Sequence, residues 1–176
     1  MDITEVILHQ HGEQRRMFAM LDEFPRNDPE GLAFLWKRLE ILLETHAEAE
    51  ERYFYPHLLE IGTGSADADS AVDEVLDSVK DHNEIRDALR KVADAKPGTD
   101  EWWQAVIECR INNDDHMAEE ERRDLADFRV HASRELRHEI AVRFLRFEAS
   151  KAARGIPPQD KDPEEYVETH APSDRG

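Results

Sequence analysis

Two segments of the sequence pair a histidine with a glutamate four residues later. His46 precedes Glu50 in HAEAEE, and His116 precedes Glu120 in NDDHMAEEE. In an α-helix this spacing places both side chains on one face, with Cβ atoms about 5–6 Å apart. Imidazole and carboxylate groups both bind Fe, Zn and Mn, so each pair can form half of a metal site.

The position of a pair relative to the apolar stripe of its helix indicates whether it faces the core. The segment 30–60 carries leucines at helical spacing, and His46 and Glu50 continue that stripe without a phase shift. A buried carboxylate is costly unless it has a partner. We interpret the pair as metal-binding, with a hydrogen bond between the two side chains in the core as the alternative.

The second pair lies at the edge of an apolar face. His116 and Glu120 align with Trp102 and Cys109 in the segment 100–128. The carboxylates around the pair are predicted to form a solvated face. Taken alone, the pair fits a metal site and a solvated surface about equally well.

Single histidines on two further segments also fall on apolar faces. His11 lies on the stripe of the segment 3–23, and His82 lies at the centre of the inward face of 70–94. Arg86, one turn after His82, shares that face and needs an anionic partner. A lone inward histidine is more often a core residue than a ligand, so neither histidine is sufficient evidence alone.

The other histidines are predicted to lie outside any core site. Two more His-x-x-x-Glu pairs fall on polar helix faces, and the rest lie beyond a proline, on a polar face or in the tail. We interpret them as surface residues. They are His9 with Glu13, His57, His131 with Glu135, His138 and His170.

Together, four successive segments each direct a ligand towards one core. This agreement is harder to explain by coincidence than any single pair. The cores of helical bundles are a usual place for di-iron sites built from His and Glu. The candidate metal ligands are His11, His46, Glu50, His82, His116 and Glu120.

The elements that position these residues are predicted to be helices. Apolar periodicity predicts helices over 3–23, 30–60, 70–94, 100–128 and 133–153. Pro56 is expected to bend or end the second helix. No segment shows sustained strand alternation, so the fold class is all-α, an antiparallel up-down four-helix bundle over 1–128. A fifth helix within 129–155 is expected to pack on the bundle. Residues 156–176, rich in Pro, Asp and Glu, are predicted to form a disordered acidic tail.

Composition limits the classes of partner. The chain has 176 residues and a formal net charge of -18, from 41 acidic and 23 basic side chains. This charge repels nucleic-acid phosphates and anionic lipid, so we expect neither nucleic acid nor a membrane as a partner. One cysteine excludes an internal disulfide, and no signal peptide or bilayer-length apolar run is evident. We therefore expect a cytoplasmic protein.

The ordered set of ligands resembles the hemerythrin-like family, also called the HHE cation-binding domain. The resemblance covers 1–128 and rests on ILHQHGEQRRMF, HAEAEERYFYPHL, VKDHNEIRDAL and NDDHMAEEERRDL. It implies an antiparallel four-helix bundle that holds two non-haem Fe ions joined by an oxo or hydroxo group. Glu50 and Glu120 would then bridge the irons. The terminal ligands would be His11, His46, His82 and His116.

This sequence departs from the oxygen-carrying members of that family on two helices. Those members have a second histidine on the third helix, where this chain has Arg86. On the fourth helix they have His-x-x-x-x-Asp, where this chain has His116 followed by Glu120. The pattern resembles the bacterial and iron-sensing branches more closely. Two histidines per iron would leave each iron an exchangeable position.

Three more residues are candidates for roles at such a site. Tyr53 is a candidate phenolate ligand, and Tyr55 is a second candidate if the helix distorts at Pro56. Arg86 is a candidate hydrogen-bond donor to a bound peroxide, or a partner for a bridging carboxylate.

Three functions follow from this interpretation. The first is a di-iron protein that binds or reacts with O2, peroxide or NO, with catalase-like turnover or a role in oxidative or nitrosative stress defence. The second is an iron or oxygen sensor that signals through the last helix and tail to a protein partner. The third is a metal-free structural bundle with a polar core. Zn or Mn in place of Fe is the alternative for the metal.

Overall fold

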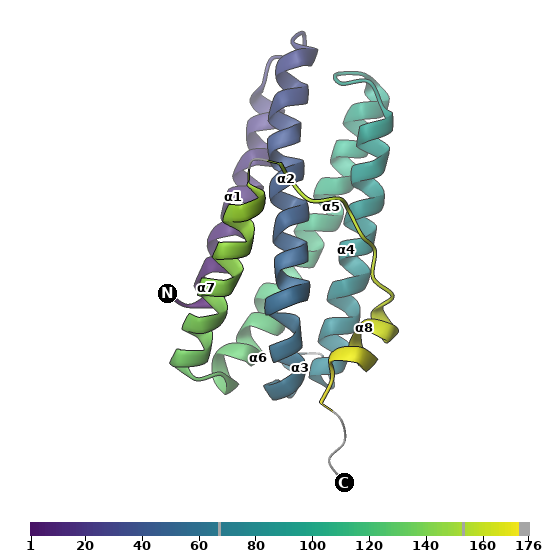
Figure 1. Ribbon diagram of the computed structural model, residues 1–176. Helices are drawn as coiled ribbons and strands as arrows, with labels where there is room; N and C mark the ends of the chain where they lie inside the picture. Colours follow the sequence, from purple (N-terminus) through teal and green to yellow (C-terminus); the bar gives the residue numbers. More distant parts are fainter. Residues whose placement is uncertain (67, 153, 173–176) are drawn as a thin grey trace.

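The computed structural model describes residues 1–66, 68–152 and 154–172, and their regular structure is entirely helical. The four longest of these helices lie side by side with alternating direction, as Figure 1 shows, which confirms the predicted bundle. The long helices are α1 (Ile3–Glu23), α2 (Pro29–Tyr53), α4 (Ala71–Asp94) and α5 (Asp100–Arg122). The others are α3 (Tyr55–Ile61), α6 (Asp124–His131), α7 (Arg134–Lys151) and α8 (Pro163–His170).

Side-chain caps explain where the long helices begin. Asp2 accepts a hydrogen bond from the backbone N–H of Thr4, and Asp28, followed by Pro29, accepts one from Gly31. Ser70 and Thr99 cap α4 and α5 in the same way. Each cap satisfies a backbone donor that the first helical turn leaves free, which fixes the start of the helix.

Two of the predicted helices are interrupted. The segment 30–60 breaks at Phe54, two residues before Pro56, as expected for a proline that cannot donate a backbone hydrogen bond. The predicted continuous helix over 100–128 is wrong, because the chain leaves α5 at Arg123 and begins α6 at Asp124. No proline marks this second break in the sequence.

The core consists of two apolar clusters at opposite ends of the bundle. One contains Ile3 and Ile7 of α1, and the other contains Met17, Phe18 and Leu21 of the same helix. Helices α2 and α4 divide between the clusters in the same way, while α5 contributes to the second cluster and α6 to the first. A buried polar layer therefore lies between them, at the level of the predicted ligands.

The C-terminal third covers one side of the bundle. Helix α7 lies along α1 and α2, with Ile140, Ala141 and Phe144 buried, as expected for a packed fifth helix. The prediction of a disordered tail is wrong for 156–172. This segment crosses α2 in Figure 1 and ends in α8, where Tyr166 and Val167 are buried. Residues 173–176 lie outside the described part of the chain.

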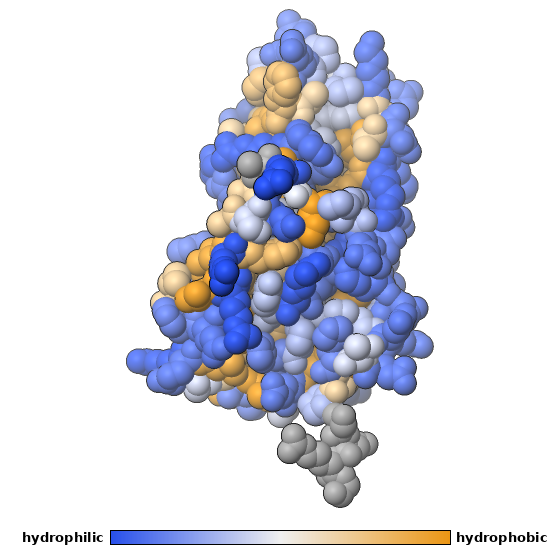
Figure 2. Space-filling model, viewed as in Figure 1, coloured by the Kyte–Doolittle hydropathy of each residue, from blue (hydrophilic) through white to orange (hydrophobic). Residues whose placement is uncertain are grey.

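The surface agrees with the acidic composition. Figure 2 shows a largely hydrophilic face with separate apolar patches. Among the described residues, no helix has the length and apolar character needed to cross a bilayer.

Candidate metal centre

Six side chains from α1, α2, α4 and α5 meet in the polar layer between the apolar clusters. All six are almost completely buried, with relative exposures between 0% and 3%, as their helical phase predicted. They are the predicted candidates His11, His46, Glu50, His82, His116 and Glu120.

The six residues form two overlapping groups. The ligand atoms of His11, His46, Glu50 and Glu120 lie within 4.8 Å of one another. A second group of the same compactness consists of Glu50, His82 and His116. In the second group, Nε2 of His82 lies 3.1 Å from Nε2 of His116. Glu50 belongs to both groups.

Glu50 faces histidines of both groups, and Glu120 faces His11 and Tyr55. Oε1 of Glu50 lies 2.9 Å from Nε2 of His46, while its Oε2 lies 3.3 Å from Nε2 of His82. Oε2 of Glu120 lies 3.1 Å from Nε2 of His11. Its Oε1 accepts a hydrogen bond of 3.2 Å from the hydroxyl of Tyr55. The two carboxylates thus lie between a His11/His46 half and a His82/His116 half of the site.

The Nδ1 atoms of the first half point away from the cluster towards acceptors. Nδ1 of His46 lies 2.6 Å from Oε1 of Gln10, and Nδ1 of His11 lies 3.0 Å from Oε1 of Glu121. An acceptor at Nδ1 holds the proton there and leaves the Nε2 lone pair free. Both Nε2 atoms then face the carboxylates as acceptors in need of a cation.

The second half has a similar outer arrangement. Nδ1 of His82 lies 2.9 Å from Oε1 of Glu51. Nδ1 of His116 faces Oδ2 of Asp81 at 3.6 Å, beyond hydrogen-bond distance. Three histidines therefore have a hydrogen-bond partner at Nδ1, and the fourth faces a carboxylate.

Sequence analysis missed these four outer residues, although a signal for them existed. Each is the immediate neighbour in sequence of a predicted ligand, so it lies about 100° around the same helix and faces the adjacent helix. Consequently each outer residue contacts a histidine on another helix. They are Gln10 on α1, Glu51 on α2, Asp81 on α4 and Glu121 on α5.

The donor set fits a metal cation. Neither oxygen of Glu50, nor Nε2 of His11 or His46, nor Oε2 of Glu120 has a hydrogen-bond partner in the described structure. Unpartnered buried polar atoms are costly, and a bound cation would satisfy these atoms together.

Electrostatics leads to the same conclusion. Burial, together with the Glu120 carboxylate, raises the pKa of Glu50 well above its usual value. Burial and the neighbouring histidines lower the pKa of His46, and that of His82 falls to about 4. His46 and His82 are therefore neutral, which is the state that binds metals, whereas hydrogen bonds to Glu120 and Glu121 raise the pKa of His11 despite its burial. A cation would relieve the repulsion between the carboxylates.

The two candidate tyrosines lie in different places. Tyr55 is fully buried, and its hydroxyl lies 3.4 Å from Nε2 of His82. Burial and the negative charges of Glu120 and Glu50 raise its pKa, so it is a neutral phenol without a cation. Tyr53 is half-buried and packs against Phe147 of α7, with ring centroids 5.8 Å apart. The structure brings Tyr55 into the site and leaves Tyr53 outside it.

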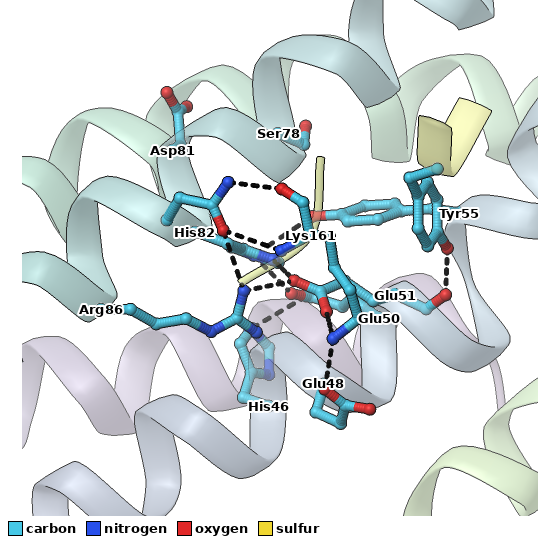
Figure 3. Close-up of polar contacts among 12 residues, drawn as sticks. His46, Glu48, Glu50, Glu51, Tyr55, Ser78, Asp81, His82, Arg86 and Lys161 are labelled. Atoms are coloured by element: carbon cyan, nitrogen blue, oxygen red, sulfur yellow. Dashed lines mark hydrogen bonds and ion pairs between the residues drawn. The ribbon is translucent and has the colours of Figure 1, made fainter. Parts of the chain in front are cut away.

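Arg86 points into the bundle, as its phase predicted, but it contacts the outer carboxylates rather than the central ones. Its Nη1 lies 2.9 Å from Oε1 of Glu51, and its Nε lies 3.5 Å from Oε2 of Glu44. Figure 3 shows Arg86 and His82 converging on Glu51. Its contact with the centre therefore passes through Glu51 and His82.

Comparison with known proteins gives one match. A family model described as the hemerythrin HHE cation binding domain matches residues 2–128. No curated protein and no solved structure matches the chain.

Proposed function

Because this chain belongs to the hemerythrin HHE cation-binding family, we propose that it holds two non-haem irons and reacts with a small oxidant, namely O2, peroxide or NO. The six buried residues of the polar layer are the proposed ligands. Imidazole and carboxylate groups accept Zn and Mn as well as Fe, so the preference for iron rests on the family.

The observation that carries this proposal is the placement of the two glutamates. Glu50 faces His46 with one oxygen and His82 with the other. Glu120 faces His11 with one oxygen and Tyr55 with the other. Carboxylates with one oxygen towards each half support a pair of metal ions rather than a single ion.

The ligand count supports reaction with a small molecule. In the proposed centre, two histidines and two shared carboxylates supply each half with four protein donors. A bound iron pair would exchange electrons with an oxidant at the positions that the protein leaves open. This division differs from the oxygen carriers that the family resemblance describes, in which a fifth histidine fills one of those positions.

Surrounding residues shape the site for that chemistry. The apolar clusters above and below the polar layer exclude bulk water, which strengthens electrostatic interactions inside. Phe144 of α7 adds an apolar wall, since its ring packs edge-on against His46 with centroids 6.0 Å apart. Tyr55 supplies the one hydroxyl found next to the His82/His116 half among the described contacts. We assign it the role of an extra ligand or of a proton donor there.

Peroxide consumption by the iron-loaded protein tests this proposal. We expect protein loaded with Fe(II) under anaerobic conditions to consume added hydrogen peroxide, with release of O2 if the turnover is catalase-like. His116→Ala should lose at least about tenfold in rate, because it removes a ligand that the second half needs. His9→Ala is the matched control, since His9 is exposed and also precedes a glutamate by four residues. Equal rates in the two variants would refute the assignment of the site.

A second candidate function, an iron-dependent regulator, is favoured by a specific contact. Lys161 in the tail forms an ion pair of 3.0 Å with Glu51, whose other oxygen contacts His82. Metal binding could thereby alter the tail and its affinity for a protein partner. Amide hydrogen exchange of residues 156–170 should then slow on iron loading, and exchange that is independent of iron would argue against a regulator.

A further inference from the structure

Glu51 is a buried carboxylate that links the proposed metal centre to the C-terminal tail. It lies on α2 with 2% exposure. Its Oε1 contacts Nδ1 of His82 and Nη1 of Arg86, each at 2.9 Å. Its Oε2 lies 3.0 Å from Nζ of Lys161. Figure 3 shows these three cationic or donor groups around one carboxylate.

The tail is anchored on both sides of this contact. The Asn83 side chain on α4 makes two hydrogen bonds with the backbone of Lys161, at 2.7 Å and 3.2 Å. Asp160 forms an ion pair of 2.7 Å with Arg90. Further along, the hydroxyl of Tyr166 donates a hydrogen bond to the backbone oxygen of Glu51. These contacts hold the Lys161 ammonium group against α2.

The charges around Glu51 show what Lys161 contributes. Lys161 also lies 3.0 Å from Oε2 of Glu48, and Arg86 also contacts Glu44. Without Lys161, Glu51 would keep Arg86 as its one arginine or lysine partner among the described ion pairs, whereas Glu48 would keep its ion pair with Arg52. His82 and Arg86 lower the pKa of Glu51 to about 2 despite its burial. The contact with Lys161 holds the second oxygen of Glu51 and so fixes the carboxylate in the orientation that meets Nδ1 of His82.

We propose that Lys161 is a positioning residue for His82, and that residues 156–170 form a strap that fixes the ring orientation and tautomer of this ligand. Lys161 fixes the orientation of the Glu51 carboxylate, Glu51 accepts a hydrogen bond from Nδ1 of His82, and Nε2 is left as the donor atom that faces the centre. The strap lies outside residues 2–128, the region that the family model matches. This inference deepens the proposed function and rests on it where it concerns metal binding.

The tautomer of His82 in the metal-free protein tests the positioning role directly. Nitrogen-15 NMR of the imidazole should show the Nδ1–H tautomer in the wild type. Lys161→Met should give a mixture of tautomers, and Lys161→Arg should restore the wild-type signal. Lys80→Met is the matched control, because it removes one exposed lysine from α4 that pairs with the exposed Glu84. Identical tautomer signals in the wild type and Lys161→Met would overturn the proposal.

Metal retention provides the second measurement. After Fe(II) loading, transfer of iron to an excess of chelator should show one of the two irons leaving up to about 10-fold faster in Lys161→Met than in the wild type. The effect should lie at the low end of the about 10–100-fold range for loss of an outer partner, because the variant loosens Glu51 and does not remove it. Tyr166→Phe should produce a smaller change in the same direction, because it loosens the strap and leaves Lys161 in place. Equal release rates in wild type and Lys161→Met would also count against the strap.

The two proposals fail in distinguishable ways. If the wild type binds no metal, the di-iron proposal fails, while the NMR comparison still decides whether Lys161 sets the tautomer of His82. If the wild type binds two irons but Lys161→Met changes neither the tautomer nor iron release, the strap proposal alone fails.

Discussion

The histidines of the polar layer are oriented by a closed ring of contacts around the bundle. Each outer residue follows or precedes a ligand on its own helix and faces a histidine on another. Gln10 of α1 contacts His46 on α2. Glu51 of α2 contacts His82 on α4, and Asp81 of α4 faces His116 on α5. Glu121 of α5 closes the ring on α1. Every long helix therefore both supplies a candidate ligand and orients the ligand of a neighbour.

Replacement of the two tyrosines separates their roles. If Tyr55 binds iron as a phenolate, the loaded protein should show a phenolate-to-ferric charge-transfer band in the visible spectrum. Tyr55→Phe should abolish that band, and Tyr53→Phe should retain it, since Tyr53 packs against Phe147 outside the site. Absorption spectra of the three proteins after aerobic iron loading provide the measurement. A band that survives in Tyr55→Phe would exclude Tyr55 as the ligand.

Helical phase placed most of the central residues in the core, left His116 and Glu120 undecided when taken alone, and did not identify the residues around them. His46 and Glu50 continue an apolar stripe, so their burial followed from the sequence alone. The sequence did not decide whether Tyr53 or Tyr55 lies in the site. Helical phase gives the direction of a side chain, but it does not give the point at which a helix breaks. Asp81 was missed because acidic residues are common in this chain, and only the tertiary structure shows which of them faces a histidine.

At the scale of elements, the two helix breaks position groups that a straight helix would misplace. The break at Phe54 follows Glu50 by four residues and lets Tyr55 turn into the core. The break at Arg123 follows Glu120 by three residues and lets Asp124 turn inwards, where Ser78 donates a hydrogen bond of 2.7 Å to it. Pro56 made the first break predictable. No local sequence signal predicts the break at Arg123, since that break depends on packing between α6 and its neighbours.

Asp127 on α6 joins that helix to the loop after α3. Its carboxylate accepts hydrogen bonds from the backbone N–H groups of Thr63 and Gly64, at 2.8 Å and 3.0 Å, and lies 2.8 Å from Nδ1 of His131. Asp127→Ala leaves these donors without their acceptor. We expect it to lower the free energy of unfolding by about 3 kcal/mol.

Urea denaturation of the metal-free variant measures this loss. Asp94→Ala, an exposed aspartate at the end of α4, serves as the control and should change the free energy by less than about 0.5 kcal/mol. An equally small effect for Asp127→Ala would show that the loop is not held by this carboxylate.

The tail illustrates a limit of composition as a guide to order. The segment 156–172 is poor in apolar residues, which predicted disorder. Burial of Tyr166 and Val167, together with the ion pairs of Lys161, provides enough contacts to fix it. These contacts join residues more than a hundred positions apart, so the sequence pattern of the tail itself does not contain them.

At the scale of the whole molecule, a charged layer separates two apolar clusters. Glu50 in that layer, and Glu44 and Glu148 near it, resist ionisation in the absence of a cation because burial raises their pKa values. Burial raises the pKa of Glu44 and of Glu148 to about 7. These buried carboxylates therefore lower the free energy of unfolding of the metal-free bundle, and a bound cation would remove that cost.

This arrangement predicts a pH dependence for the metal-free protein. A carboxyl group whose pKa is raised in the folded state stabilises it fully below the unfolded pKa of 4.5 and loses that contribution as the pH rises through about 7. The free energy of unfolding should therefore fall by about 1–2 kcal/mol between about pH 6.5 and pH 8. Burial lowers the pKa of His82 to about 4 in the folded state. His82 therefore makes the free energy of unfolding rise with pH, but only below about 6.5, the pKa of histidine in the unfolded chain.

Denaturant unfolding at the two pH values checks the sign. Glu44→Gln and Glu148→Gln should each flatten the dependence, because each removes one of the titrating groups. A metal-free protein that becomes more stable between those pH values would show that these carboxyls are not held protonated by burial.

Metal content per chain is the measurement that tests the central claim most directly. The protein should be purified without an affinity metal, loaded anaerobically with Fe(II), freed of unbound iron and submitted to elemental analysis, with His116→Ala alongside. The account predicts about two irons per chain in the wild type and fewer in the variant. A wild-type chain that retains no iron would contradict the di-iron centre and leave the polar layer as a buried hydrogen-bonded network or a site for another metal.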